Sequence, residues 1–184
     1  GKTREWEAGI GRLAGPAPAK LTSATAALLE LYLSAVKDEN CGGVLRRYPG
    51  SPRLALRLIR PDDRLVANEL HPEDAAALKA AISRDARARI LTLDAWTALR
   101  AQLPPPERRG VILIDPPFEE PGEFERISDG LAEGLQRFAS GVFLAWYPIK
   151  DLRAVETWQR SLATLGTDKV LVVDFLLRKS TDAD

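Results

Sequence analysis

The residues with the clearest chemical potential are Asp115-Pro116-Pro117-Phe118, which follow the almost wholly apolar residues 110–114. Proline has no backbone N–H, so the pair stiffens the chain and leaves carbonyl oxygens free to accept hydrogen bonds. Asp115 adds a carboxylate acceptor and Phe118 a flat aromatic face. Two acceptors and a stacking ring suit a planar base with an exocyclic amino group, whose nitrogen lone pair would then point at an electrophile. The alternative is an ordinary proline-containing turn after a strand.

Two further carboxylates, Glu69 and Asp94, follow two earlier strand-like segments. Glu69 comes after residues 65–68, where a carboxylate can accept from both hydroxyls of a ribose. Asp94 either accepts from an adenine amino group, with the backbone of Ala95 nearby, or caps the helix that begins there. A solvated strand end explains Glu69 equally well. The recurrence of a carboxylate at three strand ends, with Asp115, indicates a nucleotide site.

Three other features are weaker. Ser51 and Pro52 resemble an N-cap and the first residue of a helix, whose N-terminus suits an anionic group, although capping alone explains them. His71 precedes Pro72 and favours a local structural role at a helix start. The glycines in residues 9–15 resemble a phosphate-binding loop, but they lie in a helical pattern and follow no strand, so this reading is excluded. One His and one Cys provide neither a catalytic triad nor a metal site.

The elements that must position these residues alternate between strands and helices from residue 44 onward. We expect strands at 64–70, 88–93, 110–115, 141–146 and 169–177, and helices at 72–83, 95–101, 124–138 and 151–165. This alternation predicts an α/β fold with an open parallel sheet and ligands at the carboxyl ends of its strands. Residues 1–40 are expected to be helical. A first helix should carry an apolar face formed by Trp6, Ile10 and Leu13. A second helix, over 21–37, should carry an apolar face formed by Ala24, Leu28, Leu31 and Ala35.

Composition excludes several classes of protein. The chain has 184 residues, of which 45% are hydrophobic and 28% charged, so it is long enough for one folded domain and is not a disordered chain. It contains neither an apolar run of about 18 residues nor a signal-peptide core, and its lone Cys41 favours a reducing cytosol. The 26 basic and 26 acidic residues exclude a grossly basic nucleic-acid binder but allow a local arginine-rich face. Candidate clusters are Arg46 and Arg47, Arg53, Arg57 and Arg60, and Arg108 and Arg109.

Taken together in order, six blocks of sequence resemble the bacterial 23S ribosomal RNA adenine-N6 methyltransferases of the large-subunit methyltransferase J type. The resemblance covers nearly the whole chain. An Asp-Pro-Pro-aromatic element alone marks many amino-methyltransferases, whereas the ordered set is far more specific. The blocks are Arg47-Tyr48-Pro49-Gly50-Ser51-Pro52, Glu69-Leu70-His71-Pro72, Ser83-Arg84-Asp85-Ala86-Arg87-Ala88-Arg89, Arg109-Gly110, Leu113-Ile114-Asp115-Pro116-Pro117-Phe118-Glu119 and Trp146-Tyr147-Pro148.

The resemblance implies a Rossmann-like methyltransferase that uses S-adenosylmethionine, with a helical insertion over residues 1–47 and a partial core over 48–184. It implies cofactor contacts at Ser51, Glu69, Asp94, Ala95 and Asp115, and catalytic roles for Asp115, Pro116 and Phe118. Ala95 replaces the usual Gly, so only a backbone contact carries over, and Phe118 replaces a Tyr. The family's first strand with its glycine-rich loop, and its final strands, are expected to be absent from this chain.

The implied partner is 23S rRNA, in the cytoplasm, with a monomer favoured and neither a membrane nor a metal involved. Three alternatives stay open. The same chemistry would serve an enzyme acting on adenine in DNA or on another amino-bearing base. The sheet would also serve a non-catalytic RNA-binding module. Glu69 alone would suit a nicotinamide-dependent dehydrogenase, in which the Asp-Pro-Pro-Phe motif has no role.

Overall fold

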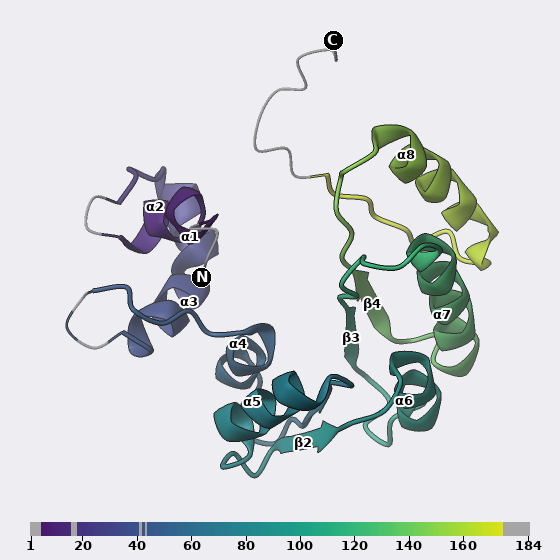
Figure 1. Cartoon of the computed structure of the whole chain (residues 1–184), viewed down its shortest axis with the longest axis horizontal. Helices are drawn as coiled ribbons and strands as arrows, with labels where there is room; N and C mark the ends of the chain where they lie inside the picture. The colour runs from purple at the N-terminus through teal and green to yellow at the C-terminus, as the bar shows by residue number, and fades with distance from the viewer. Residues whose placement is uncertain (1–4, 16–17, 41, 43, 175–184) are drawn as a thin grey trace. The chain divides into compact units, whose positions relative to one another are not determined.

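The computed structural model describes residues 5–15, 18–40, 42 and 44–174, and the chain divides into two compact units, Gly1–Ala95 and Trp96–Asp184 (Figure 1). Each unit is built on one pair of parallel strands with helices against it. Among the described residues, no helix is long and apolar enough to cross a membrane.

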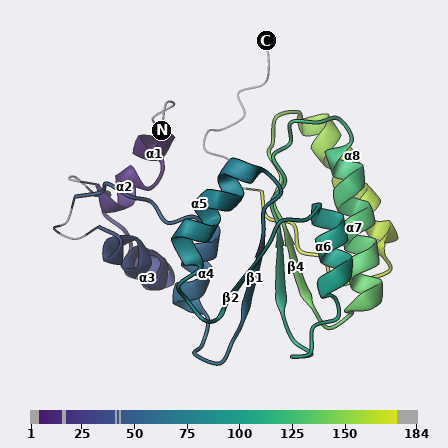
Figure 2. The same ribbon diagram turned by 60° about the horizontal axis from the view of Figure 1, so that its bottom comes forward.

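The first unit packs two helices against a parallel strand pair. In Figure 2, α4 and α5 lie side by side on one side of β1 and β2. The strands pair from Leu65 with Ala88 to Asn68 with Leu91, and the core between helices and strands is formed by Leu56, Ala67 and Ile82. The elements are α1 (Glu5–Ala8), α2 (Gly11–Ala14), α3 (Ser23–Asp38), α4 (Ser51–Leu58), β1 (Leu65–Asn68), α5 (Pro72–Ile82) and β2 (Ala88–Leu91).

Of the two predictions for the N-terminal helices, one is wrong, and the other, a helix over 21–37, is confirmed by α3. The single helix expected around Trp6 and Leu13 is two short helices, α1 and α2, because the chain turns at Gly9 and Ile10 and glycine is a poor helix former. The predicted apolar face of α3 is present but largely uncovered, since Leu28 is 83% and Leu31 71% exposed. Only the last turns of α3 contribute buried apolar side chains. Hydrophobic periodicity predicts a helix, but burial also requires a neighbouring element.

The start of α4 is displaced by one residue from the prediction. Gly50, not Ser51, is the N-cap, and Ser51 and Pro52 are the first two helical residues. The Gly50 carbonyl accepts the first hydrogen bonds, from the N–H groups of Arg53 and Leu54 at 3.0 and 3.1 Å. Proline is tolerated in this first turn because its missing N–H would have no helical partner.

The second unit also places its helices on one side of a parallel strand pair. Its strands pair from Val111 with Val142 to Ile114 with Ala145. The buried core consists of Ile127, Leu131, Trp158 and Leu162. The elements are α6 (Ala95–Gln102, beginning at the last residue of the first unit), β3 (Val111–Ile114), α7 (Glu123–Arg137), β4 (Val142–Ala145), α8 (Leu152–Ser161) and the 3₁₀ helix η1 (Leu162–Leu165).

The expected alternation of strands and helices is confirmed, whereas the expected sheet is not. Four predicted strands appear, and both pairs are parallel, but they form two two-stranded sheets instead of one open sheet. Residues 169–174 form no strand, and 175–177 lie outside the described residues. A strand is completed only by hydrogen bonds to a neighbour, which the local apolar pattern does not specify. Alternate residues of β3 and β4, which point to one face of this strand pair, are exposed, namely Val111, Leu113, Val142 and Leu144.

Two glycines on α7 allow close packing in the second unit. A Cβ at Gly130 would lie 2.1 Å from Cζ3 of Trp96, and one at Gly134 would lie 2.5 Å from Cε1 of Phe143. Both distances are too short for real contacts, so each ring occupies the place of the missing side chain. Glycine inside a helix costs about 1 kcal/mol relative to alanine, and the ring contacts account for its presence here.

We therefore expect Gly130→Ala to destabilise the protein, although it improves helix propensity. A clash of 2.1 Å places the overpacking cost in the upper part of its usual range, about 2–3 kcal/mol, and the propensity gain is about 1 kcal/mol, so the net loss should be about 1–2 kcal/mol. Urea denaturation would measure it. Gln136→Ala, on an exposed position of the same helix, should leave the free energy of unfolding nearly unchanged. An unchanged or raised stability of Gly130→Ala would contradict the packing argument.

Candidate functional site

The motif at the end of β3 forms an exposed corner in the second unit. Asp115 directly follows the last strand residue, Ile114, and its side chain is exposed. β4 ends at Ala145, opposite Ile114, and the Trp146 N–H donates to the Ile114 carbonyl at 2.9 Å. Asp115 and Trp146 therefore occupy neighbouring positions at the carboxyl ends of two parallel strands. This is the edge at which α/β sheets bind ligands.

Phe118 is held in a fixed place beside this corner. Its φ of 53° is in the left-handed region, which a bulky residue rarely adopts and which costs about 1–3 kcal/mol. Its half-buried ring lies edge-on to Phe124 and to Trp146, with centroids 5.2 and 6.0 Å apart. Edge-on aromatic pairs are favourable and fix ring orientation. The strained backbone and the aromatic contacts together orient the ring.

Trp146 was not assigned a role from the sequence. It is 51% exposed, which is unusual for so large an apolar side chain, and it lies next to Asp115 on the neighbouring strand end. An aromatic residue immediately after a predicted parallel strand was the signal that could have identified it. The corner therefore offers two aromatic rings, one carboxylate and one proline carbonyl.

A hydrogen-bond network anchors the segment that carries Trp146. The Tyr147 hydroxyl donates to Asp174 and accepts from Nε2 of Gln159 on α8 at 2.9 Å. Its ring packs edge-on to Trp158, with centroids 4.8 Å apart. Burial, together with the hydrogen bond to Asp174, raises the pKa of Tyr147, so the hydroxyl stays protonated and continues to donate. Tyr147 thus ties the end of β4 to the helical core.

In the first unit, the two strand-end carboxylates are brought to one edge. The Asn68 side chain donates to the Leu93 carbonyl at 2.8 Å and accepts from the Leu93 N–H at 3.0 Å. These two bonds join the end of β1 to the segment after β2, next to Asp94. Glu69, one residue after Asn68, donates its backbone N–H to the Leu91 carbonyl at 3.1 Å. Asn68 is a positioning residue that the sequence analysis missed, although an amide at the last position of a strand was a visible signal.

One of the two oxygens of the Glu69 carboxylate accepts a hydrogen bond from the backbone nearby. One oxygen, Oε1, accepts from the His71 N–H at 2.9 Å, so the side chain is oriented while the other oxygen has capacity left. His71 is the N-cap of α5, and its Nδ1 lies 3.5 Å from Asp74. The expected site residues thus form two sets. Ser51, Glu69, Asp94 and Ala95 belong to the first unit, and Asp115, Pro116 and Phe118 to the second.

Comparison with known families identifies the chain. The model of the family described as "Ribosomal RNA large subunit methyltransferase D, RlmJ" matches residues 1–184. The chain belongs to this family. Ribosomal RNA large subunit methyltransferase J from Escherichia coli K12 is 40% identical over 154 residues, which is 84% of this chain and 55% of the relative. The protein of the same name from Haemophilus influenzae Rd is 34% identical over 182 residues, which is 98% of this chain and 63% of the relative.

The fold of the chain is also similar to that of a solved structure. A crystal structure of a protein from Legionella pneumophila strain Philadelphia 1 matches with a TM-score of 0.79 and 32% identity, over 88% of this chain and 59% of that one. The mixed α/β architecture with short parallel sheets is therefore that of a methyltransferase family. The chain spans less than two thirds of the curated relatives it matches. Within the described residues, no three His, Cys, Asp or Glu side chains are grouped to hold a metal ion.

Proposed function

We propose that the protein transfers a methyl group from S-adenosylmethionine to the N6 amino group of an adenine in 23S rRNA. The observation that carries the proposal is the exposed corner of Asp115 and Pro116 at the end of β3, flanked by the rings of Phe118 and Trp146. Family membership supports the same reading. Such a reaction on ribosomal RNA belongs to the cytoplasm, and one chain supplies the residues that we assign, so a monomer suffices.

The residues present suit S-adenosylmethionine. When bound, it supplies a methyl group on a sulfonium centre, which is already an activated electrophile. The second oxygen of the Glu69 carboxylate can accept hydrogen bonds from ribose hydroxyls. Asp94 and the backbone of Ala95 suit the amino group and ring of an adenine. Ser51, the first residue of α4, suits an anionic group through its hydroxyl and its own N–H, since Pro52 has no N–H and those of Arg53 and Leu54 bind the Gly50 carbonyl. We assign these residues and Asp115 to cofactor binding within a Rossmann-like arrangement.

At the target base, two hydrogen-bond acceptors orient the amino group. The Asp115 carboxylate and the Pro116 carbonyl accept the two amino hydrogens of the adenine, which directs the N6 lone pair away from them and toward the methyl carbon. As the N–C bond forms, the bond between the methyl carbon and sulfur would break, its electron pair returning to sulfur as the neutral thioether leaves. Positive charge develops on N6, and the negative charge of Asp115 stabilises it. The proton then leaves N6 toward Asp115. No covalent bond to the protein is required.

The aromatic rings compensate for the cost of exposing the base. Extruding an adenine from a stack costs a few kcal/mol, and stacking on an aromatic side chain returns about 1–3 kcal/mol per base. Phe118, held by its neighbours, provides such a face, and Trp146 provides a second wall. Fixed rings lose little entropy when the base binds.

We expect Phe118→Ala and Trp146→Ala each to weaken capture of the base by about 10-fold, because about 1–3 kcal/mol of stacking is lost. Single-turnover methylation over a range of RNA concentrations would show a raised half-saturation with a smaller change in the limiting rate. Trp146→Phe retains an aromatic face and should recover most of the affinity. A Trp146→Ala protein with the affinity of the parent would remove Trp146 from the base site.

The proposal is tested by labelled-methyl transfer with the full-length protein. Protein-free 23S rRNA should accept the label at an adenine N6, and duplex DNA should not. Transfer to DNA alone would favour the DNA enzyme, whose chemistry at Asp115 is identical. Calorimetric titration with S-adenosylmethionine separates both from a non-catalytic RNA-binding module, which would bind RNA without binding the cofactor.

A further inference from the structure

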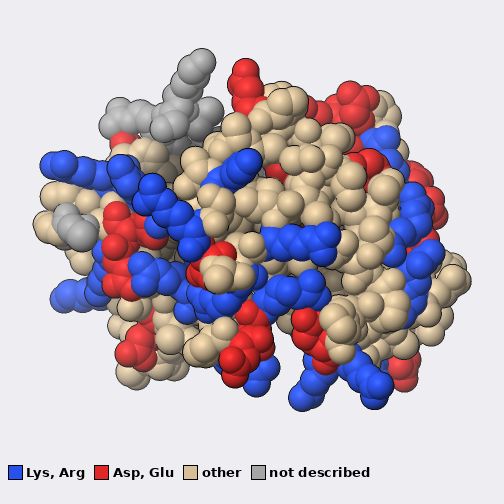
Figure 3. All heavy atoms as spheres, turned by 90° about the horizontal axis from the view of Figure 1, so that it is seen from below, with Lys and Arg blue, Asp and Glu red and all other residues tan. Residues whose placement is uncertain are grey.

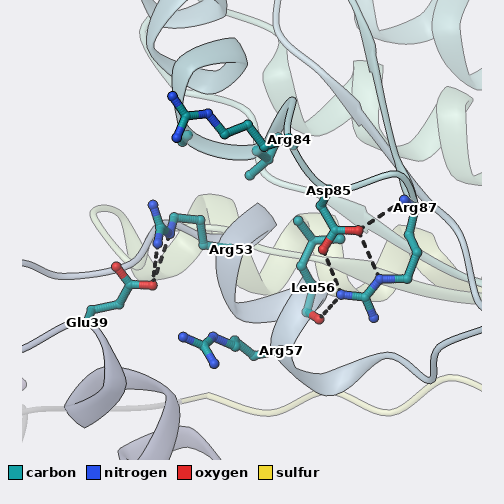
Figure 4. Close-up of a pocket in the computed structure, with 9 residues that line it drawn as sticks. Glu39, Arg53, Leu56, Arg57, Arg84, Asp85 and Arg87 are labelled. Atoms are coloured by element: carbon teal, nitrogen blue, oxygen red, sulfur yellow. Dashed lines mark hydrogen bonds and ion pairs between the residues drawn. The ribbon is translucent and has the colours of Figure 1, made fainter.

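An arginine-lined cavity of about 400 Å³ lies within the first unit (Figure 4). The end of α3, one face of α4, the end of α5 and the turn before β2 form its walls. None of the residues that we assign to catalysis or cofactor binding lines it. The lining residues are Glu39, Arg53, Leu56, Arg57, Ala81, Ile82, Arg84, Asp85 and Arg87.

One wall of this cavity is structural. Arg87 donates to both oxygens of Asp85, at 3.0 and 2.7 Å, and to the Leu56 carbonyl at 2.9 Å. The hydrogen bonds from Arg87 lower the pKa of Asp85 to about 2, so the pair stays ionised at neutral pH. The guanidinium of Arg87 is thereby committed to holding α4 against the turn before β2. It is a part of the scaffold, with little capacity for a ligand.

The other three arginines have donors to spare. A guanidinium carries five N–H donors. Arg53 uses Nε and Nη2 on the Glu39 carboxylate, and Arg57 uses Nη1 on Asp38 at 3.2 Å. Arg84 is exposed and makes no ion pair or hydrogen bond within the described part of the chain. In Figure 4 these three guanidinium groups lie on the same side of the view, away from the Asp85–Arg87 pair.

We propose that this cavity binds a backbone phosphate of the RNA substrate, with Arg84 and Arg57 as its principal ligands and Arg53 held in place by Glu39. The proposal rests on the proposed function for the identity of the ligand. Arginine forks match phosphate oxygens two at a time and are the preferred residues for such contacts. Four arginines against two carboxylates leave the lining positively charged.

The charge balance of the whole chain favours a local site of this kind. The formal net charge is zero, so long-range attraction to RNA is weak and phosphate affinity must come from particular places on the surface. Figure 3 shows Asp and Glu side chains among the Lys and Arg side chains of the viewed face. An exposed arginine with unused donors at a cavity wall is therefore a strong candidate for a phosphate contact.

The test is the salt dependence of binding to a protein-free 23S rRNA transcript by the full-length protein. Arg57→Gln/Arg84→Gln should bind about 10-fold more weakly at low salt, and the slope of log affinity against log salt should become shallower by about 1. Arg89→Gln is the matched control: Arg89 is exposed on β2 of the same unit, is unpaired among the described residues and does not line the cavity. It should bind as the parent does.

The outcomes separate this proposal from the proposed function. The cavity is not a phosphate site if the double variant keeps the RNA affinity and the salt slope of the parent. The same conclusion holds if Arg89→Gln loses as much RNA affinity as the double variant. A loss of RNA affinity in the double variant but not in Arg89→Gln, with the affinity for S-adenosylmethionine unchanged, supports the proposal. That result would hold even if the full-length protein transferred no methyl group to 23S rRNA, because it reports on binding alone. Thermal unfolding at the parent temperature confirms that the variant is folded.

Discussion

Asp115→Ala should lower methyl transfer to 23S rRNA by about 10³-fold in the proposed reaction, because the substitution removes both a hydrogen-bond acceptor and the negative charge that we assign to stabilising the developing ammonium. The side chain is exposed at the end of β3 and contributes nothing to the buried core, so the protein should fold normally. The loss should appear in the limiting single-turnover rate at saturating cofactor and RNA. That condition separates chemistry from any weakening of cofactor binding.

Two further variants sharpen this test. Asp115→Asn keeps the shape and one acceptor oxygen but removes the negative charge, so its rate should lie between those of the parent and the alanine variant. Glu120→Gln, at an exposed carboxylate five residues later, should retain the parent rate. If Asp115→Ala methylates RNA as fast as the parent, Asp115 has no part in the reaction.

Asn40→Ala should destabilise the protein by about 3–5 kcal/mol, the largest stability effect that we expect of a single side chain. Asn40 is 9% exposed and sits just after α3. Its Nδ2 donates to the carbonyls of Val36 and Arg47 at 2.8 and 2.7 Å, and its Oδ1 accepts from the N–H groups of Arg46 and Arg47 at 2.7 and 2.8 Å. Alanine would leave all four backbone groups without this partner.

The Asn40 amide also holds the segment before α4 in place. Its removal should therefore loosen this segment as well as lower the stability of the whole protein. Hydrogen exchange at the N–H groups of Arg46 and Arg47 should accelerate, and the urea midpoint should fall. Asn40→Asp can accept as before but cannot donate to the two carbonyls, and it should also destabilise. Ser34→Ala, on an exposed position of α3, should change little. Parent-like exchange at Arg46 in Asn40→Ala would contradict this account.

The sequence alone was sufficient to predict the order of strands and helices from β1 to α8, although not the absence of a strand over residues 169–174. The apolar segment 111–114 was correctly predicted to be a strand, although alternate residues of it are exposed, and the predicted helix starts at Pro72 and Ala95 agree with α5 and α6. These features are local, since periodicity, proline and glycine act within one turn or one strand. The strand-end positions of Glu69, Asp94 and Asp115 followed from the same local signals.

What the sequence could not determine was which surfaces and side chains would meet. Trp146 lies beside Asp115 only because β3 and β4 pair in one register, and Asn68 reaches Leu93 only because β1 pairs with β2. The exposure of Leu28 on α3 likewise depended on whether another element covered it.

The same distinction applies to the arginines. Their number and clustering were evident from the sequence, but one of them, Arg87, is tied to the carbonyl of Leu56, 31 residues away, while Arg84 is unpaired among the described residues. Contacts between residues far apart in the chain come from tertiary packing, and the entropy of bringing them together is overcome by the whole core and not by any local motif. The residue types at the strand ends could therefore be predicted from the sequence, whereas the partners of each side chain were determined by the tertiary structure.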